Sequence, residues 1–255
     1  MNTQAQKIAL ITGGSRGLGR NTAESLARRG VDVVITYHSR ADEGRTVVAA
    51  VEAQGRKGIA LQLDTAATGT FDHFTDALKT ALRGSWGRDR FDFLINNAGT
   101  SYHNGIEQTT EADLDALYTV HLKGVFFLTQ KLIPLINDGG RIVNLSSGVT
   151  RIIYPGSGPY AVMKGAVEVL TKYLAKELGP RRIAVNVVAP GPIATDFSGG
   201  MVRDNPEVNK HIADMTALGR AGLPDDIGPM IASLLSEDNR WINAQRIEVS
   251  GGTSI

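Results

Sequence analysis

The sequence predicts an α/β protein: one doubly wound domain with a seven-stranded parallel sheet and helices on both faces. Short β-branched runs alternate with helical patterns along all 255 residues, which is the order of βαβ units. Residues 31–35 and 183–188 are almost entirely apolar, as in strands that are covered on both faces. No repeat, low-complexity tract or linker marks a boundary in the sequence, so we expect a single domain over residues 1–255.

In the N-terminal half, four strands and three helices are expected. The strands are short runs rich in Val, Ile, Leu and Phe, at residues 7–12, 31–37, 58–63 and 91–96. The helices lie between them, at residues 17–29, 41–54 and 70–83. The first of these helices has Ala23, Leu26 and Ala27 at helical spacing and stops at Gly30.

In the C-terminal half, a long helix is expected first, because Thr110 and Asp113 have the spacing of a capping box. Pro159 suits the first position of a second long helix. The helices cover residues 111–136, 159–178 and 224–236, and the strands residues 141–146, 183–188 and 246–249. The stretch of about 191–224 is rich in Gly and Pro, and we expect it to be a mobile substrate-loop insertion.

The composition excludes several classes of function. The chain has no Cys, so it has no disulfide, thiolate zinc site, iron–sulfur cluster or cysteine nucleophile. Lys and Arg total 27 against 26 for Asp and Glu, which argues against a nucleic-acid partner. No apolar run is long enough for a signal peptide or a membrane span, so a cytoplasmic protein is expected. The histidines show no metal-ligand spacing, and no metal site is predicted.

A glycine-rich turn joins the first strand to the first helix. Gly13, Gly17 and Gly19 have the spacing G-x-x-x-G-x-G. A strand that turns sharply into a helix can bring backbone N–H groups to a pyrophosphate. An ordinary glycine-rich turn is the alternative, but the strand before and the helix after favour dinucleotide binding.

The segment after the second strand favours NADP(H) over NAD(H). It carries no acid before Asp42, whereas an acid at this place would accept hydrogen bonds from a ribose and repel a 2′-phosphate. Arg16, Ser39 and Arg40 offer donors for such a phosphate. The alternative is that both arginines are solvated surface charges, with NAD(H) as the cofactor.

Tyr160 and Lys164 form the second chemical motif. At i and i+4 near a helix start, their side chains lie on one face. Ser146 and Ser147 end the fifth strand, at the edge where open α/β sheets bind ligands. The Tyr-x-x-x-Lys pattern is weak evidence for a catalytic site by itself, and its position near Ser146 and Ser147 strengthens it.

Together these motifs resemble the short-chain dehydrogenase/reductase family, in particular its 3-oxoacyl-carrier-protein-reductase-like branch. The matching residues occur in the family's order across nearly the whole chain: Thr12, Gly13, Gly17, Gly19, Asp64, Asn96, Asn97, Ala98, Gly99, Ser147, Tyr160, Lys164, Pro190, Gly191 and Thr195. The resemblance implies a Rossmann-type fold and an NADP(H)-dependent oxidoreductase that reduces a ketone or a 3-oxoacyl group to a secondary alcohol by hydride transfer. It also implies a homotetramer, in which the helices expected at 111–136 and 159–178 pack across an interface.

The resemblance assigns roles to these residues. Tyr160 is the general acid, Lys164 and the oxidised nicotinamide lower its pKa, and Ser147 donates a hydrogen bond to the substrate oxygen. Asp64 accepts from the adenine amino group, and Asn96 and its neighbours lie along the adenosine ribose. The structural alternatives are that Asp64 caps a turn and that Asn97 ties strands together. The cofactor-binding set is Gly13, Ser15, Arg16, Gly17, Leu18, Gly19, Ser39, Arg40, Asp64, Asn96, Ala98, Gly99, Tyr160, Lys164, Pro190, Gly191, Ile193 and Thr195.

One position departs from the family's pattern. His121 stands where the family usually has an Asn that helps to hold a water linked to the catalytic Lys. His121 is therefore a candidate catalytic residue, and we hypothesise that it preserves activity by holding a water or relaying the proton. Alternatively, His121 weakens the proton relay, or the backbone carbonyl of His121 serves the relay and its side chain matters little.

The physiological substrate, its stereochemistry and the working direction are not readable from the sequence. A partly apolar small molecule is expected to bind among residues 100–105, 149–157 and 197–216. Two alternative functions stay open: an NAD(H)-dependent alcohol or sugar dehydrogenase, and a cofactor-sensing binding protein with little turnover.

Overall fold

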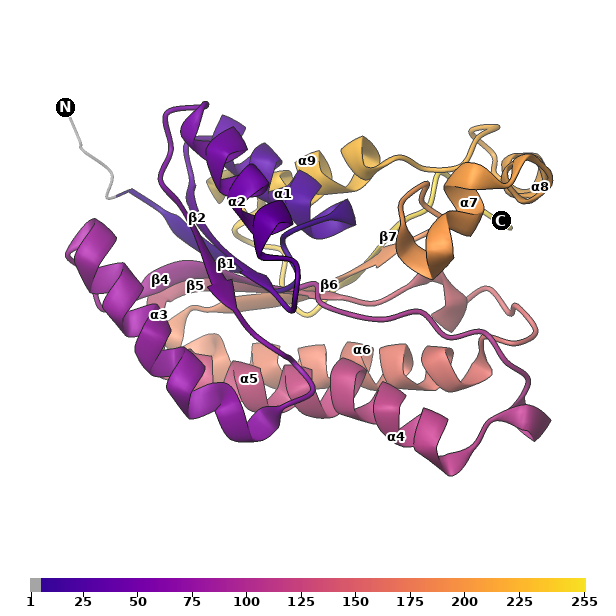
Figure 1. The fold of residues 1–255 in the computed structure, drawn as a ribbon, viewed down its shortest axis with the longest axis horizontal. Helices are drawn as coiled ribbons and strands as arrows, with labels where there is room; N and C mark the ends of the chain where they lie inside the picture. Colours follow the sequence, from indigo (N-terminus) through magenta and orange to yellow (C-terminus); the bar gives the residue numbers. More distant parts are fainter. Residues whose placement is uncertain (1–5) are drawn as a thin grey trace.

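The computed structural model describes residues 6–255, so the first five residues of the predicted domain lie outside the described residues. Seven parallel strands form one sheet in the order β3-β2-β1-β4-β5-β6-β7 (Figure 1). The strands are β1 (Ile8–Ile11), β2 (Asp32–Tyr37), β3 (Gly58–Gln62), β4 (Phe91–Asn96), β5 (Ile136–Leu145), β6 (Ala184–Pro190) and β7 (Arg246–Val249). The predicted fold class is confirmed.

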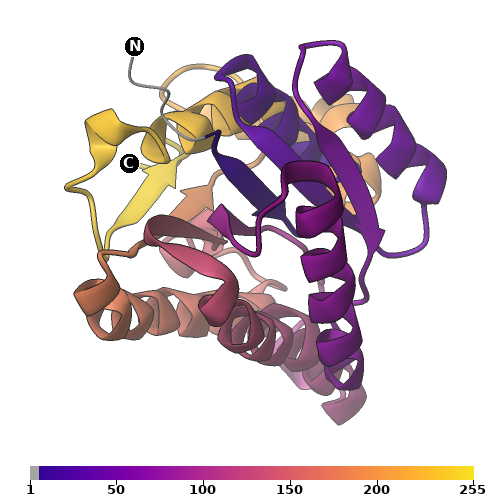
Figure 2. The same cartoon turned by 90° about the vertical axis from the view of Figure 1, so that its left-hand side faces the viewer.

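Helices cover both faces of the sheet, as Figure 2 shows from the side. One layer holds α1 (Gly17–Arg28), α2 (Ala41–Glu52) and α9 (Pro224–Leu234), and the other holds α3 (Phe71–Trp86), α4 (Glu111–Tyr118), α5 (Gly124–Leu132) and α6 (Gly158–Leu178). Strand β1 serves both layers: Ala9 and Ile11 belong to the core on the α1 side, whereas Ile8 and Leu10 belong to the core on the α3 side. Alternate residues of a strand point to opposite faces, which explains why these strands are continuously apolar.

The long helix predicted over residues 111–136 is present over residues 111–135, but it is not α-helical throughout. A π-helical turn at Thr119–Lys123 separates α4 from α5, and a 3₁₀ turn at Ile133–Leu135 ends the helical segment. The extra residue in a π-helical turn locally re-aims the side chains around it, here including His121. Strand β5 then begins at Ile136, which pairs with Phe91, so it starts five residues before the predicted strand start at residue 141.

Residues 191–224 are more regular than expected, because they contain α7 (Met201–Asp204) and α8 (Pro206–Met215). The Asn205 side chain accepts hydrogen bonds from the N–H groups of Glu207 and Val208, and Pro206 occupies the first turn of α8. Asn-Pro is a readable helix start that the sequence prediction missed. The mobility of this segment stays a prediction.

No helix within residues 6–255 is long and apolar enough to cross a membrane. The same residues contain no group of three or more His, Asp or Glu side chains that is arranged to hold a metal ion.

Candidate active site

The glycine turn lies at the carboxyl ends of β1 and β4, where the strand order changes direction. Gly13 and Gly17 have φ angles of +62° and +53°, which L side chains rarely adopt. A Cβ atom on Gly19 would lie 2.3 Å from the carbonyl oxygen of Gly13. The turn is therefore folded tightly on itself, and its glycines are required by backbone shape.

The segment after β4 holds this turn in place. The Asn97 amide donates to the carbonyl oxygens of Thr12 and Gly13 at 2.9 and 3.0 Å, as expected for a residue that ties strands together. Asn96 is buried and donates to Thr129 Oγ1 at 3.0 Å and to Asn144 Oδ1 at 2.8 Å. Because the Asn96 side chain belongs to the interior, only its backbone is left for a cofactor contact.

The start of α1 has the properties of an anion site. Within residues 6–255, no side chain accepts a hydrogen bond from the first N–H groups of α1. These N–H groups form the positive end of the helix dipole. A cavity of about 280 Å³ adjoins it and is lined by Gly17, Arg20, Asn21, Glu24, Ala194, Thr195, Asp196, Arg203 and Pro224. Free backbone donors beside a glycine cradle fit the pyrophosphate of a dinucleotide.

The predicted phosphate donors lie at the rim of this region. Arg16 Nη1 is 2.5 Å from Asp196 Oδ2, and Arg40 Nη1 is 2.7 Å from Glu43 Oε1. Ser39 is exposed between β2 and α2. The two guanidinium groups are more than half exposed, so they can turn from these carboxylates to a 2′-phosphate.

Asp64 lies near this rim, and its Oδ1 accepts from the Ala66 N–H at 2.8 Å. His38 Nε2 is 3.6 Å from Asp64 Oδ2. The Asp64 carboxylate thus caps a turn, which is the alternative role that the sequence analysis offered for it. It also stays accessible at the surface.

Ser147, Tyr160 and Lys164 come together at the carboxyl end of β5. Tyr160 lies in the first turn of α6, and Lys164 Nζ is 5.6 Å from the centroid of its ring. Lys164 Nζ also donates to the carbonyl oxygen of Leu145 at 2.9 Å. Ser147 is the second residue after β5, and its hydroxyl lies close enough to the Tyr160 phenol to affect the pKa of that phenol.

Burial sets the ionisation of this group. It raises the pKa of Tyr160 above its ordinary value, and the hydrogen bond with Ser147 lowers that pKa in part. Burial also lowers the pKa of Lys164 to about 8. The pKa of Tyr160 therefore moves in the direction opposite to the lowering expected from Lys164 and the oxidised nicotinamide together, because desolvation outweighs the hydrogen bond with Ser147. Tyr160 is thus a neutral phenol near pH 7, which suits a proton donor.

His121 lies against Tyr160 in the π-helical turn. Its side chain is only 1% exposed, and the two rings meet edge to face with centroids 5.1 Å apart. The Thr100 N–H points at Nε2 from 3.4 Å, so the remaining imidazole proton belongs on Nδ1, which has no hydrogen-bond partner within residues 6–255. Burial, followed by the positive charge of Lys164, lowers the pKa of His121 to about 3. The imidazole is therefore neutral.

The segment after β6 closes the site on the other side. The Gly191 N–H donates to the Val249 carbonyl at 3.0 Å, and a Cβ on Gly191 would lie 2.8 Å from Ser250. Thr195 is buried, and its Oγ1 accepts from the Phe197 N–H at 3.1 Å. The Phe197 ring lies 6.4 Å from that of Tyr160. The predicted substrate region thus reaches the Tyr160 phenol through Phe197.

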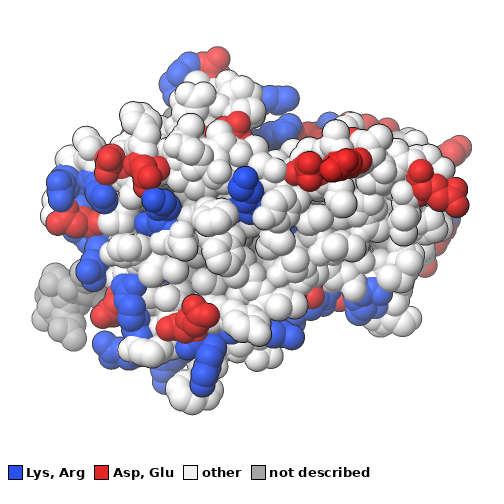
Figure 3. Space-filling model, turned by 90° about the horizontal axis from the view of Figure 1, so that it is seen from below, with Lys and Arg blue, Asp and Glu red and all other residues white. Residues whose placement is uncertain are grey.

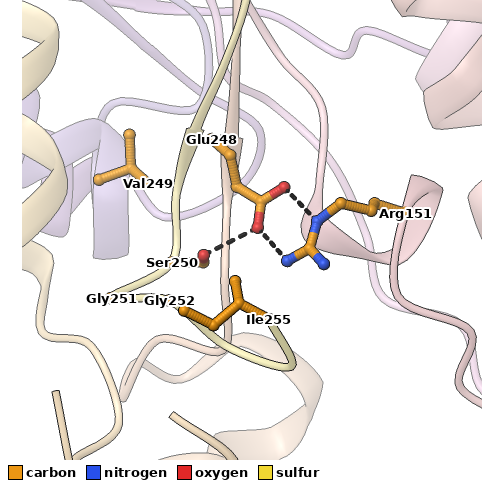
Figure 4. A pocket seen from close by; sticks show the side chains of 7 residues that line it. All are labelled: Arg151, Glu248, Val249, Ser250, Gly251, Gly252 and Ile255. Atoms are coloured by element: carbon orange, nitrogen blue, oxygen red, sulfur yellow. Dashed lines mark hydrogen bonds and ion pairs between the residues drawn. The ribbon is translucent and has the colours of Figure 1, made fainter. Parts of the chain in front are cut away.

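Sequence reasoning missed a network of charged side chains behind Ser147. Arg151 contacts Glu248, almost one hundred residues away, and Glu248 also contacts Arg246. Arg151 and Glu248 line a cavity of about 590 Å³ together with residues 249–252 and Ile255 (Figure 4). Such distant pairs leave no local signal in a sequence.

A family model described as enoyl-(acyl carrier protein) reductase matches residues 13–254 of the chain. The chain belongs to the short-chain dehydrogenase/reductase family. This reductase-family chain is also 33% identical to a hydroxynaphthalene reductase-like protein, Arp2, of Metarhizium brunneum, over 98% of the chain and 95% of that protein.

Two solved structures are similar to this short-chain dehydrogenase/reductase over nearly their whole length. The promiscuous reductase LugOII, which catalyses keto-reduction at C1 during lugdunomycin biosynthesis, has a TM-score of 0.93 and 36% identity, covering 99% of this chain and 100% of its own. The angucycline C-6 ketoreductase LanV, solved with bound NADP, has a TM-score of 0.92 and 35% identity, covering 97% and 95%.

Proposed function

We propose that this short-chain dehydrogenase/reductase uses NADPH to reduce a ketone to a secondary alcohol. The observation that carries the proposal is the meeting of Ser147, Tyr160 and Lys164 at the sheet edge that also carries the glycine turn. The names of LugOII and LanV, both keto-reducing enzymes, support it.

NADP fits the residues present. The uncapped start of α1 and the cradle around Gly13 and Gly19 would hold the pyrophosphate. Arg16, Ser39 and Arg40 would bind the 2′-phosphate. The LanV structure with bound NADP supports this choice of cofactor.

In the proposed mechanism, NADPH held by the glycine turn and its neighbours would supply the hydride for ketone reduction. Ser147 donates a hydrogen bond to the carbonyl oxygen as negative charge builds there. Tyr160, held protonated by burial, gives its phenolic proton to that oxygen and completes the alcohol. The Lys164 ammonium stabilises the phenolate that is left, until solvent returns the proton.

His121 completes this group as a neutral positioning residue. Its pKa of about 3 rules against an imidazolium that carries the proton near neutral pH. Its edge contact instead restrains the ring of Tyr160, and its Nδ1–H is free to hold a water.

The substrate class is an apolar ketone, with fused aromatic rings as the best match. Four large apolar side chains around the predicted substrate region are exposed: Ile106, Ile153, Phe197 and Met201. The Phe197 ring beside Tyr160 offers a surface on which a flat ring can pack. The names of LanV and of the hydroxynaphthalene reductase-like protein, which refer to polycyclic compounds, support this class.

The chain also presents a surface suited to a homotetramer. Figure 3 views the face that carries α4, α5 and α6, and a broad uncharged band crosses it between groups of both signs. Exposed apolar side chains lie on these three helices: Leu114, Tyr118, Phe126, Phe127, Val162, Val169 and Tyr173. An exposed patch of this kind marks an interface between protein chains.

NADPH oxidation with a small carbonyl panel tests the function. The panel contains 1-tetralone, acetoacetyl-CoA and crotonyl-CoA, which represent an aryl ketone, a 3-oxoacyl thioester and an enoyl thioester. We expect turnover of 1-tetralone, and we expect Tyr160→Phe to lower kcat by about 10²–10⁴-fold with NADPH affinity unchanged.

Three outcomes would contradict the proposal. Turnover of crotonyl-CoA alone would indicate double-bond reduction, as the description of the matching family model suggests. NADPH binding without turnover of any panel member would favour a cofactor-sensing protein. Full activity of Tyr160→Phe would remove Tyr160 from its role as acid.

A further inference from the structure

Four charged side chains form a compact group between the turn that follows β5, helix α6 and strand β7. This group, here named the β7 cluster, consists of Arg151, Glu168, Arg246 and Glu248. Arg246 pairs with Glu168 at 2.9 Å and with Glu248 at 3.0 Å, and Arg151 Nε donates to Glu248 Oε2 at 2.7 Å. Two positive and two negative charges cancel, so their partial burial is less costly than that of an unpaired ion.

One side of the β7 cluster holds the residues around Ser147. Glu168 Oε1 accepts from Ser146 Oγ at 2.6 Å and from Thr150 Oγ1 at 2.7 Å. The Thr150 hydroxyl also lies 3.0 Å from the carbonyl oxygen of Ser147 and accepts from Arg246 Nη2 at 3.0 Å. Ser146 and Thr150, which lie on either side of Ser147 in the sequence, thus both contact the Glu168 carboxylate.

The other side holds the segment of residues 250–254. Figure 4 shows the forked contact of Arg151 with Glu248 and the contact of Ser250 with the same carboxylate. Arg151 also donates to the carbonyl oxygens of Thr253 and Ser254, at 2.7 and 3.1 Å. The Arg151 guanidinium group therefore binds both strand β7 and the segment that follows it.

That segment continues the connection to the end of α8. Thr253 is fully buried, and its hydroxyl lies 3.1 Å from that of Thr216. The Ser254 N–H donates to the Met215 carbonyl at 2.9 Å. A chain of polar contacts thus runs from Ser147 through Arg151 to the C-terminal end of the predicted substrate segment.

We propose that the β7 cluster is a positioning unit, which fixes the hydroxyl of Ser147 beside Tyr160 and couples this placement to α8. The turn Gly148–Thr150 is a single 3₁₀ turn, and the Thr150 side chain adds contacts with Ser147 and Glu168 to its backbone hydrogen bonds. The hydrogen bond from Arg151 holds the pKa of Glu248 at about 2, so Glu248 stays ionised at the pH of turnover. The catalytic part of this inference rests on the proposed ketone reduction, whereas the coupling does not.

A matched pair of variants tests the positioning of Ser147. Thr150→Val removes the bridging hydroxyl at nearly constant volume, and Thr150→Ser keeps it. We expect Thr150→Val to lower kcat for 1-tetralone about tenfold with the Kd for NADPH unchanged, and Thr150→Ser to restore kcat. Asp76→Asn, which removes a charge from an exposed pair on α3, is the control and should match the wild type. Equal kcat in Thr150→Val and the wild type would overturn the positioning role.

Hydrogen exchange tests the coupling without any turnover. We expect Arg151→Gln to speed amide exchange at least tenfold in residues 148–152 and also in residues 215–218, with α3 unchanged. Faster exchange in only one of the two segments, or in neither, would overturn the coupling. If the wild type reduces no ketone, the proposed function fails, and this measurement still decides whether the β7 cluster links the two segments.

Discussion

The two halves of the site are built by different means. The nucleotide half, at the ends of β1 and β4, is shaped by backbone: Gly19 packs on the Gly13 carbonyl, and Asn97 ties the turn to β4. The half that we propose to be catalytic, here named the catalytic half, lies around the end of β5 and beside β7. It is shaped by side chains: Arg151 pairs with Glu248, and the Thr150 hydroxyl contacts the Ser147 carbonyl.

This difference predicts different responses to substitution. A backbone cradle fails when any atom is added, because neighbouring backbone cannot move aside cheaply. A side-chain network loses its function when a charge or a hydroxyl is removed, and a conservative replacement can restore it. Substitutions in each half therefore test whether the contrast holds.

The largest effect is expected at Gly19 in the nucleotide half. In Gly19→Ala, the new Cβ would lie 2.3 Å from the Gly13 carbonyl oxygen and 2.5 Å from Asn97 Nδ2, so the turn must shift. We expect the Kd for NADPH, measured by fluorescence titration, to rise about 100-fold and the unfolding free energy to fall by about 1–3 kcal/mol.

Gly84→Ala is the control for Gly19→Ala. Gly84 lies in helix α3, and a Cβ there would meet open space, so alanine should stabilise the protein by up to about 1 kcal/mol. Wild-type NADPH affinity in Gly19→Ala would show that the tight packing of the turn is not needed.

A smaller effect is expected at Arg40, at the rim of the same half. Arg40→Asp replaces a phosphate donor by an acid that accepts from ribose hydroxyls. We expect the ratio of kcat/KM for NADPH to that for NADH to fall about tenfold, since one charge-assisted hydrogen bond contributes about 1.5–3 kcal/mol. Arg45→Asp makes the same charge change at an exposed position of α2 and should leave the ratio unchanged. An unchanged ratio in Arg40→Asp would contradict the assignment of the 2′-phosphate site.

The smallest effect is expected at His121 in the catalytic half. Because folding lowers its pKa from 6.5 to about 3, the unfolded chain binds a proton that the folded chain does not between these values. The resulting stabilisation is complete above pH 6.5 and is lost as the pH falls towards 3. His121→Asn should therefore flatten the pH dependence of the unfolding free energy in this window, by at most about 1.4 kcal/mol per pH unit.

Turnover gives the second measurement on His121. We expect His121→Asn to change kcat less than fivefold and to leave the shape of the pH–rate profile between pH 5 and 9 unaltered, because the imidazole is neutral throughout. Loss of a step in that profile would show that His121 carries the proton. His73→Asn, at an exposed position of α3, is the control for both measurements.

The sequence was most informative where a local pattern carries the structure. The bounds of β4 and β7 agree with the prediction, and α1, α2 and α6 agree within about two residues. The prediction of a helix over residues 119–123 did not distinguish its π-helical turn, because a π-helical turn and an α-helix share nearly the same apolar spacing.

By itself, the sequence determined the alternation of strands and helices, the glycine turn and the pairing of Tyr160 with Lys164. These depend on periodicity and on neighbours one turn apart, which the order of residues records directly. Only the tertiary structure decided the neutral state of His121, the raised pKa of Tyr160 and the β7 cluster. Burial and long-range ion pairs depend on which distant segments meet, and that is fixed by packing.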